Sequence, residues 1–300
     1  MLFRTGPTMD DDARLLQQLM EESLSFEYQQ GGVTVVDDPH TTKWRTLPCL
    51  ISAQVTYLVK YEIADRGRQN DVQPGEVLLV PPGIRHNLTK ISPGPGTSRW
   101  SHVNFRVFTS VDILTLIELP LRIQDPGRAV AIGEINARLV PIARNDASAT
   151  TTAIESLSRA VTRKALGLDL LRLILDVSTP RPRAFEVLRA AQRLSPALVA
   201  IDRDLAMPPR SVDALSSLVD LSRSRMQTLF QDAFGMSPMR YLRHRRLERS
   251  RQLLLTSDLA VGSVAAQTGF TDQFHFSRAF KSEFGASPLT FRQRVQKAIS

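Results

Sequence analysis

The chain has 300 residues, of which 42% are apolar and 23% charged, and its formal net charge is +8. This composition is typical of a folded globular protein and excludes a disordered chain, and the length is sufficient for two domains. The longest apolar stretches, such as LDLLRLILDV at 168–177, carry charges and are shorter than the roughly 18 residues that a membrane span needs. We therefore expect no membrane partner.

Cysteine and charge narrow the class of protein further. Cys49 is the only cysteine, so no intramolecular disulfide can form, and MLFRTGPTMDDD becomes acidic before any apolar signal-peptide core. We therefore expect a cytoplasmic protein. Residues 181–300 hold 19 Lys and Arg against 10 Asp and Glu, a net +9, which leaves residues 1–180 at −1. A basic C-terminal domain beside a neutral one favours a polyanion binder with a second module.

Residues 30–110 alternate in the manner of β-strands. VTVV, AQVTYLVKYEI, GEVLLVPPG and HVNFRVF are the strand segments, and DRGRQND and SPGPGTS break them. Short strands with Pro and Gly between them predict a small barrel or sandwich. PGEVLLVPPGIRH at 74–86 resembles the second motif of the cupin barrels, with Gly75, Pro81, Gly83 and His86 in step. The resemblance implies a cupin-like barrel.

The same motif raises the alternative of a metal enzyme. Enzymatic cupins take most of their metal ligands from an HxH and a Glu in a first motif, and this chain has no HxH. His86 alone cannot complete a site of three or four ligands, so we expect no metal, no cofactor and no catalytic residues. A cupin metal enzyme remains the least favoured alternative.

Aromatic and basic residues of the N-terminal half are the candidates for contacts with a small effector. Rings stack on sugars or bases, and guanidinium groups bind carboxylates or phosphates. An uncharged sugar and an anionic metabolite or nucleotide both remain open as effectors. The candidate residues are Trp44, Arg45, Arg66, Arg68, Arg85, His86, Trp100, Phe105 and Arg106.

The pattern becomes helical over 111–180. One apolar stripe runs through Ile154, Leu157, Val161, Leu168, Leu171 and Leu175. The stripe either packs on the barrel or pairs two protomers as a dimer, and both alternatives stay open. STPRPR at 178–183 contains two prolines and two arginines and is predicted to link the two domains.

The C-terminal part contains two copies of one unit. FGMSPMRYLR at 234–243 recurs as FGASPLTFRQ at 284–293, and upstream of this the offset falls from 50 to 49 residues. Each copy predicts a short helix, a tight turn and a second helix. The boundaries come from helix punctuation: N-caps, terminating glycines and prolines at first helical positions. These residues are Ser211, Ser222, Gly235 and Pro238 in the first copy, and Thr271, Gly285 and Pro288 in the second.

This layout is a helix-turn-helix, in which the second helix enters the DNA major groove. The units are predicted at about 211–235 and 261–285, joined by a connecting helix at 238–255. A helix of that length spans about 27 Å, close to the roughly 34 Å between successive major-groove segments on one face of a duplex. One monomer could therefore read two adjacent turns of DNA. A helical bundle that binds a protein is the alternative.

The region from about 183 to 294 closely resembles the AraC/XylS family of bacterial transcription regulators. The resemblance is strongest in YLRHRRLERSRQLLLTSDLAVGSVAAQTGFTDQFHFSRAFKSEFGASPLTFR at 241–292. It implies a DNA-binding protein with two helix-turn-helix units per monomer, most often an activator that recruits RNA polymerase. Family members commonly carry a barrel before the DNA-binding half, use it to bind an effector, and form dimers.

The resemblance and the helix geometry together give candidate DNA contacts. The positions from which the family reads bases fall here on Ser224, Thr228, Gln273, Phe274 and Arg278, and the exposed helix faces add Gln227 and His275. An exposed Phe274 would touch a thymine methyl, or it would pack back onto its own domain. Helix N-termini and basic side chains give the phosphate candidates. These are Ser222, Arg223, Arg225, Arg240, Arg243, Arg246 and Thr271.

The sequence therefore predicts an α+β protein, with an N-terminal cupin-like barrel plus helices and an all-α C-terminal domain with two helix-turn-helix units. We place the barrel at 1–110, a helical segment at 111–180 and the DNA-binding domain at 183–300. The expected function is a ligand-responsive, homodimeric transcription regulator that binds double-stranded promoter DNA. The alternative is a constitutive DNA-binding regulator whose barrel only dimerises or binds a protein.

Overall fold

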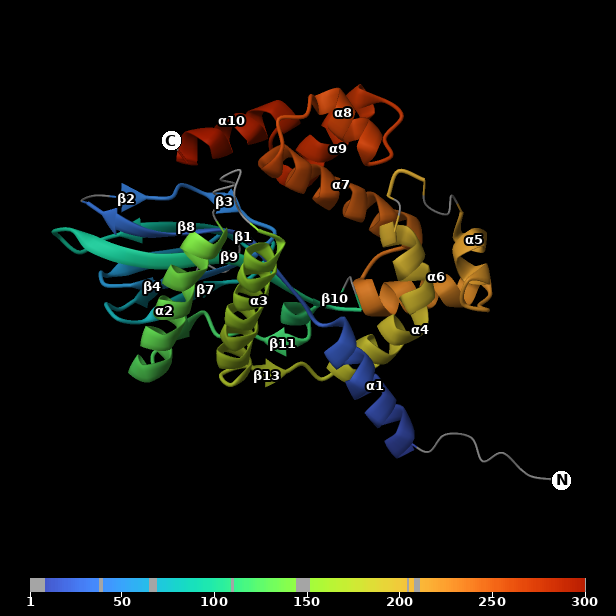
Figure 1. Ribbon diagram of the computed structural model, residues 1–300, viewed down its shortest axis with the longest axis horizontal. Helices are drawn as coiled ribbons and strands as arrows, with labels where there is room; N and C mark the ends of the chain where they lie inside the picture. The colour runs from blue at the N-terminus through green and yellow to red at the C-terminus, as the bar shows by residue number, and fades with distance from the viewer. Residues whose placement is uncertain are drawn as a thin grey trace. The chain divides into compact units, whose positions relative to one another are not determined.

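The computed structural model describes residues 9–37, 40–64, 69–108, 111–143, 152–203, 205–207 and 211–299. The chain divides into two compact units (Figure 1). The barrel unit consists of Leu24–Val107 with Asp112–Ala184, and the helical unit of Met1–Ser23 with Phe108–Val111 and Phe185–Ser300. The predicted α+β class, with an N-terminal β unit and a C-terminal helical unit, is confirmed. Within the described ranges, no helix is both long and apolar enough to cross a membrane.

The β-strands of the first half are short except for two, β1 and β9, which pair along their length. The strands are β1 (Ser25–Val36), β2 (His40–Thr41), β3 (Arg45–Thr46), β4 (Leu50–Val55), β5 (Val59–Ile63), β6 (Gln69–Val72), β7 (Val77–Val80), β8 (Arg85–Lys90), β9 (Gly96–Val107), β10 (Val111–Asp112), β11 (Ile117–Glu118), β12 (Arg122–Ile123) and β13 (Thr179–Pro180), with a 3-10 turn at Ile113–Thr115.

Two antiparallel sheets form the barrel. One has the strand order β1-β9-β4-β7-β12, and the other has the order β2-β8-β5-β6 with β3 beside β8. Side chains alternate between the two faces of a strand. The inner faces meet in an apolar core to which both sheets contribute, with Ile51 and Val80 from the first sheet and Val59, Tyr61 and Val72 from the second. The buried apolar area of this core holds the two sheets together.

The cupin-like motif forms the turn before β7 and the turn that leads into β8. Gly75 (φ 95°) and Gly83 (φ 77°) both have left-handed backbone conformations that disfavour any side chain. The amide of Gly75 donates to the Val55 carbonyl at 2.7 Å, and that of Gly83 donates to the Leu47 carbonyl at 2.8 Å. The glycine spacing therefore serves the barrel backbone.

Two helices cover the outer face of the first sheet, α2 (Pro126–Ala143) and α3 (Ala153–Leu175). The α2 helix packs on β1, β9 and β4, and α3 packs on α2 and β1 (Figure 1). The predicted apolar stripe of α3 does not form one continuous buried face, because Ile154, Leu157 and Val161 are 75%, 62% and 60% exposed. The buried face lies in the C-terminal half of the helix and consists of Leu166, Leu170, Leu171, Leu173 and Ile174.

The predicted linker at 178–183 is largely fixed in place. Thr179 and Pro180 form β13, which pairs with β11, and the amide of Arg181 donates to the Leu116 carbonyl at 2.8 Å. Its guanidinium Nε also donates to the Ile117 carbonyl at 2.9 Å. The chain between the last of these contacts and the next helix is therefore a turn of two residues.

The helical unit contains α1 (Met9–Ser23). The domain bounds predicted from the sequence included this segment in the barrel at 1–110, whereas in the structure it groups with the helical unit. Its other helices are α4 (Ala184–Arg203), α5 (Val212–Ser217), α6 (Arg223–Phe234), α7 (Pro238–Thr256), α8 (Val261–Gln267), α9 (Gln273–Phe284) and α10 (Pro288–Ile299). The pairs α5–α6 and α8–α9 are the two predicted helix-turn-helix units, and α7 connects them.

Helix punctuation follows the predicted boundaries with one correction. Ser211, Ser222 and Ser237 cap α5, α6 and α7, and Gly235 and Gly285 end α6 and α9 in the left-handed conformation. Thr271 does not cap α9. The N-cap is Asp272, whose carboxylate accepts the amide protons of Phe274 and His275, each at 2.9 Å. Thr271 is the extra residue that changes the repeat offset from 49 to 50.

Each helix-turn-helix unit has its own apolar core. Met226 and Phe230 of α6 pack with Leu215 of α5 and with Leu194 and Leu198 of α4. Phe276 and Phe280 of α9 pack with Val264 of α8 and with Leu247 and Leu254 of α7. Because α7 contributes to both cores, it positions α6 and α9 relative to each other.

Candidate DNA-binding face and barrel interior

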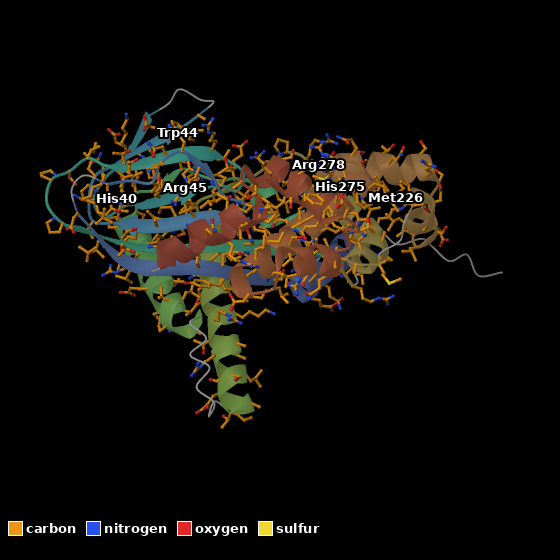
Figure 2. The ribbon with its side chains drawn as sticks, turned by 90° about the horizontal axis from the view of Figure 1, so that it is seen from above. His40, Trp44, Arg45, Met226, His275 and Arg278 are labelled. Atoms are coloured by element: carbon orange, nitrogen blue, oxygen red, sulfur yellow. The ribbon has the colours of Figure 1, made fainter. Side chains whose placement is uncertain are left out.

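The second helix of each unit presents a polar outer face. All seven base-reading candidates are exposed: Ser224, Gln227 and Thr228 on α6, and Gln273, Phe274, His275 and Arg278 on α9 (Figure 2 labels His275 and Arg278). The Phe274 side chain is 79% exposed, so it does not pack back onto its own domain. The structure therefore leaves these side chains accessible to a duplex.

The phosphate candidates divide into accessible and engaged side chains. Ser222, Arg225, Arg240 and Arg243 are exposed, and Ser222 Oγ accepts the amide proton of Arg225 at 3.2 Å. Arg223 is exposed as well, but its Nη1 lies 3.4 Å from Asp213 Oδ2 of α5. Exposed ion pairs of this kind contribute little and exchange readily for a phosphate.

Arg246 and Thr271 fit the phosphate role least well. Arg246 Nε donates to the Leu205 carbonyl at 2.9 Å, which fixes the segment after α4 onto α7. Thr271 precedes Asp272, whose carboxylate already occupies the first free amides of α9. A phosphate at that helix end would meet a negative charge, whereas the N-terminus of α6 combines free donors with arginines.

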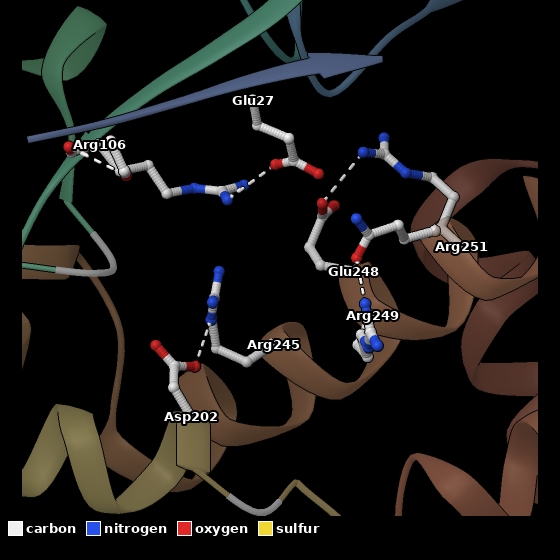
Figure 3. A network of polar contacts seen from close by, with 9 residues as sticks. Glu27, Arg106, Asp202, Arg245, Glu248, Arg249 and Arg251 are labelled. Carbon is white, nitrogen blue, oxygen red and sulfur yellow. Dashed lines mark hydrogen bonds and ion pairs between the residues drawn. The ribbon is translucent and has the colours of Figure 1, made fainter. Parts of the chain in front are cut away.

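Further charged contacts fix α7 within the unit (Figure 3). Arg245 Nε donates to Asp202 Oδ1 of α4 at 2.8 Å, whereas Arg251 Nη2 lies 3.1 Å from Glu248 Oε2 within α7 itself. The Arg251 guanidinium also lies 5.5 Å above the Phe284 ring at the end of α9. These positioning roles do not follow from the sequence, because Arg245 and Arg251 occur in an arginine-rich helix whose pattern does not show which arginines face inward.

The barrel contains a second group of candidates, centred on Arg45. Arg45 on β3 pairs with His86 on β8, and its Nε lies 3.4 Å from His86 Nε2. His86 is fully buried, and its Nδ1 lies 2.9 Å from the Ile84 carbonyl. Nδ1 must therefore carry the proton, which leaves Nε2 as the acceptor for Arg45. Burial lowers the pKa of His86, and Arg45 lowers it further, so the imidazole is neutral at neutral pH.

His102 lies on the inner face of β9 and completes this group. Its Nδ1 lies 2.8 Å from Gln30 Nε2 of β1, and its ring centroid is 4.9 Å from that of Trp100. Burial lowers the pKa of His102 to about 3, and Arg45 and His86 contribute to the shift. Arg45 and His86 of the second sheet and His102 of the first sheet thus all face the barrel interior, and the three groups carry one positive charge among them.

The other effector candidates lie elsewhere. Trp44 is 45% exposed and has the Arg85 guanidinium 5.7 Å from its ring, on the outside of the barrel (Figure 2 labels Trp44 and Arg45). Phe105 is fully buried against Phe26, on the opposite face of β9 from Trp100. Arg106 forms an ion pair of 3.0 Å with Glu27 (Figure 3). Arg66 and Arg68 lie outside the described residues.

Within the ranges the structure describes, no group of three or more His, Cys, Asp or Glu residues is arranged to hold a metal ion.

Trp100 lies against the β1 backbone. A Cβ at Gly32 would come 3.1 Å from the indole Nε1, and that nitrogen donates to Thr34 Oγ1 at 3.0 Å. The glycines of β1 thus allow the indole to lie on the inner face.

The chain is similar in sequence to known transcription regulators. A family model described as a helix-turn-helix domain matches residues 215–294. The arabinose operon regulatory protein of Salmonella typhimurium is 27% identical over 242 residues, covering 77% of this chain and 79% of that protein. The HTH-type transcriptional regulator AlkR of Acinetobacter baylyi is 40% identical over 103 residues, covering 34% of this chain and 33% of AlkR. Among solved structures, ToxT from Vibrio cholerae matches 90% of this chain and 98% of its own, at 12% identity and a TM-score of 0.47.

Two helix-turn-helix units on one connecting helix, together with these sequence matches, define a DNA-binding transcription regulator. The C-terminal part of the chain thus resembles the AraC/XylS family of transcription regulators, as its sequence motifs predicted. Its relatives in these comparisons are regulators and not enzymes.

Proposed function

We propose that the protein is an effector-controlled regulator that binds promoter DNA through α6 and α9 and holds a small molecule inside its barrel. The observation that carries the DNA-binding part is the pair of exposed polar helix faces, both packed on α7. The barrel part rests on the polar group of Arg45, His86 and His102, and on the arabinose operon regulatory proteins among its relatives. A ligand controls DNA binding only as far as it binds one arrangement of the units more tightly than another.

The finer parts of the proposal follow the family. The protein acts in the cytoplasm as a homodimer and, as an activator, recruits RNA polymerase. The exposed residues Ile154, Leu157 and Val161 of α3 recur at intervals of three and four, the spacing of a coiled-coil seam, and are the proposed dimer contact. This surface also favours the second candidate, a constitutive regulator whose barrel only dimerises.

The DNA-binding part is tested by comparing Arg278→Ala with Arg243→Ala on a selected cognate site. Arg278→Ala is expected to cost about 1 to 3 kcal/mol and to relax the preference at one base pair, because a guanidinium can grip guanine O6 and N7. Arg243→Ala is expected to weaken all sequences alike and to flatten the salt dependence. Binding is measured by fluorescence anisotropy over a salt series.

Unchanged sequence preference in Arg278→Ala would remove this residue from the base readers, and altered preference in Arg243→Ala would contradict its phosphate role. Size-exclusion chromatography of Leu157→Glu with Val161→Glu tests the dimer contact, and soluble monomers are expected. A dimer that survives both substitutions would contradict it. If DNA affinity is the same with and without every ligand that binds the barrel, the constitutive alternative holds.

A further inference from the structure

The Arg45 guanidinium differs from Arg106, the other inward-facing arginine of the barrel, in having no carboxylate partner among the described residues, although the Cys49 thiol lies near enough to act on its pKa. Arg106 is neutralised by Glu27 at 3.0 Å. Among the residues the structure describes, Arg45 forms no ion pair, and its hydrogen bond to His86 uses only Nε. The imidazoles of His86 and His102 are neutral, so neither one balances the positive charge of Arg45. A charge taken partly out of water without a counter-ion is costly, so this arrangement favours binding of an anion.

The geometry around Arg45 leaves its outer edge ready to bind a ligand. His86 accepts the Nε proton, which orients the guanidinium plane, and the two terminal nitrogens have no hydrogen-bond partner among the described residues. These two donors match the two oxygens of a carboxylate in a bidentate contact. His102 adds a donor, because Gln30 donates to its Nδ1 and the remaining proton is on Nε2.

The charge and the surroundings narrow the class of anion. A single positive charge with two neutral imidazoles balances a monoanion, whereas a phosphate dianion would keep one charge uncompensated in a partly buried setting. Trp100 lies on the same inner face and is only partly buried against the apolar core. Its ring suits an apolar ligand body.

We propose that the barrel binds a small organic monocarboxylate, with the carboxylate held by Arg45 and His102 and the apolar part against Trp100. The inference rests on the proposed effector-binding role of the barrel and names the chemical class of its ligand. It gives Arg45 the anion-binding role, His86 a positioning role, and Gln30 the task of fixing the tautomer of His102.

The test is calorimetric titration of the full-length protein with sodium benzoate and sodium hexanoate. The controls are the uncharged benzamide and hexanamide, inorganic phosphate and L-arabinose. At least one carboxylate is expected to bind, with its amide at least tenfold weaker. Arg45→Gln is expected to lose at least tenfold in affinity for the carboxylate, whereas Arg85→Gln, an arginine on the outside of the barrel, stays within twofold of the wild type.

A second experiment measures the thermal stability of two variants and needs no ligand. Arg45→Met is expected to change the thermal unfolding midpoint little, because the removal of an uncompensated charge offsets the loss of the donor to His86 Nε2, and Arg106→Met is expected to lower the midpoint because Glu27 loses its partner. A marked loss of stability in Arg45→Met would show a structural role and overturn the proposal.

The outcomes separate this inference from the proposed function. Equal binding of amide and carboxylate, binding of phosphate alone, or unchanged affinity in Arg45→Gln overturns the carboxylate site. Binding of L-arabinose that survives Arg45→Gln also overturns it, while the effector-controlled regulator stands. No binding by either carboxylate overturns the carboxylate site, and an unaltered DNA affinity in the same protein leaves the DNA-binding function intact.

Discussion

The two helix-turn-helix units have the same arrangement of helices but different residues in the turn and at the start of the second helix. Position for position, Asp220 (φ 50°) in the first turn corresponds to Gly269 (φ 78°) in the second, and Ser222 corresponds to Asp272 as the N-cap of the second helix. Asp213 forms an ion pair with Arg223 in the first unit. At the same positions the second unit has Gly262 against the Gln273 side chain.

These differences give the units different electrostatic characters. The first recognition helix, α6, begins with Ser222, Arg223 and Arg225 and suits a phosphate at its N-terminus, whereas α9 begins with a carboxylate. The two copies of the repeat therefore have equivalent apolar cores but different charges at the start of the second helix. We infer that α6 anchors the DNA backbone more strongly and that α9 depends more on base contacts.

The largest expected effect comes from making the second turn bulky. A Cβ at Gly269 would lie 2.5 Å from the Leu205 carbonyl oxygen and 2.7 Å from Arg246 Nη2, in addition to the left-handed strain. Gly269→Ala should therefore cost about 2 to 4 kcal/mol of unfolding free energy, measured by urea denaturation. The matched control is Gly235→Ala, which has the same strain in open space and should cost about 1 kcal/mol. Equal costs would show that the close approach at Gly269 does not matter.

The next effect separates the two N-caps. Ser222→Ala removes one bond to a helix amide and should cost about 1 kcal/mol. Asp272→Ala frees two amides and removes a charge from the positive helix end, so it should lower the thermal midpoint further. The pKa of Asp272 is lowered by the bonds from the amides of Phe274 and His275. Its contribution is therefore present above the unfolded pKa and is lost as pH falls through the folded one. A lowering of the midpoint by Asp272→Ala, relative to the wild type, that persists in acid would contradict this.

A smaller effect is expected in DNA binding. Asp272→Asn keeps an oxygen for capping but removes the negative charge from the start of α9, so affinity for all sequences should rise by a few-fold at low salt. The matched variant Ser222→Asn changes a cap without changing charge and should leave affinity nearly constant. Fluorescence anisotropy at two salt concentrations measures both. An unchanged affinity in Asp272→Asn would indicate that phosphate does not approach the α9 N-terminus.

The smallest effect tests the first turn. Asp220 is a non-glycine residue in the left-handed region, so Asp220→Gly relieves strain but loosens the unfolded chain. The two terms nearly cancel, and a gain of a few tenths of a kcal/mol is expected. A loss above about 1 kcal/mol would mean that the Asp220 side chain stabilises the turn in its own right.

Local signals made the helical unit predictable, and long-range pairing limited the barrel. Caps, glycines and prolines act within a few residues, so the bounds of α6 and α7 and the end of α9 followed from the sequence. Thr271 and Asp272 are both residue types that cap helices well, and the sequence does not show which of them lies at the start of α9. The face to which Phe105 points, the Glu27–Arg106 pair and the Arg45–His86 contact depend on strand register across many residues, which alternation alone does not fix. The burial of α3 likewise depends on where α2 covers it.

The short junction after β13 determines where a chimeric protein could be joined. Since Arg181 is bonded to the Leu116 and Ile117 carbonyls and α4 begins at Ala184, only Pro182 and Arg183 separate the last barrel contact from the first helix of the next unit. A chimeric regulator assembled from two relatives should therefore be joined within these two residues. A junction placed before β13 would take β11 and β13, which pair with each other, from two different parent proteins.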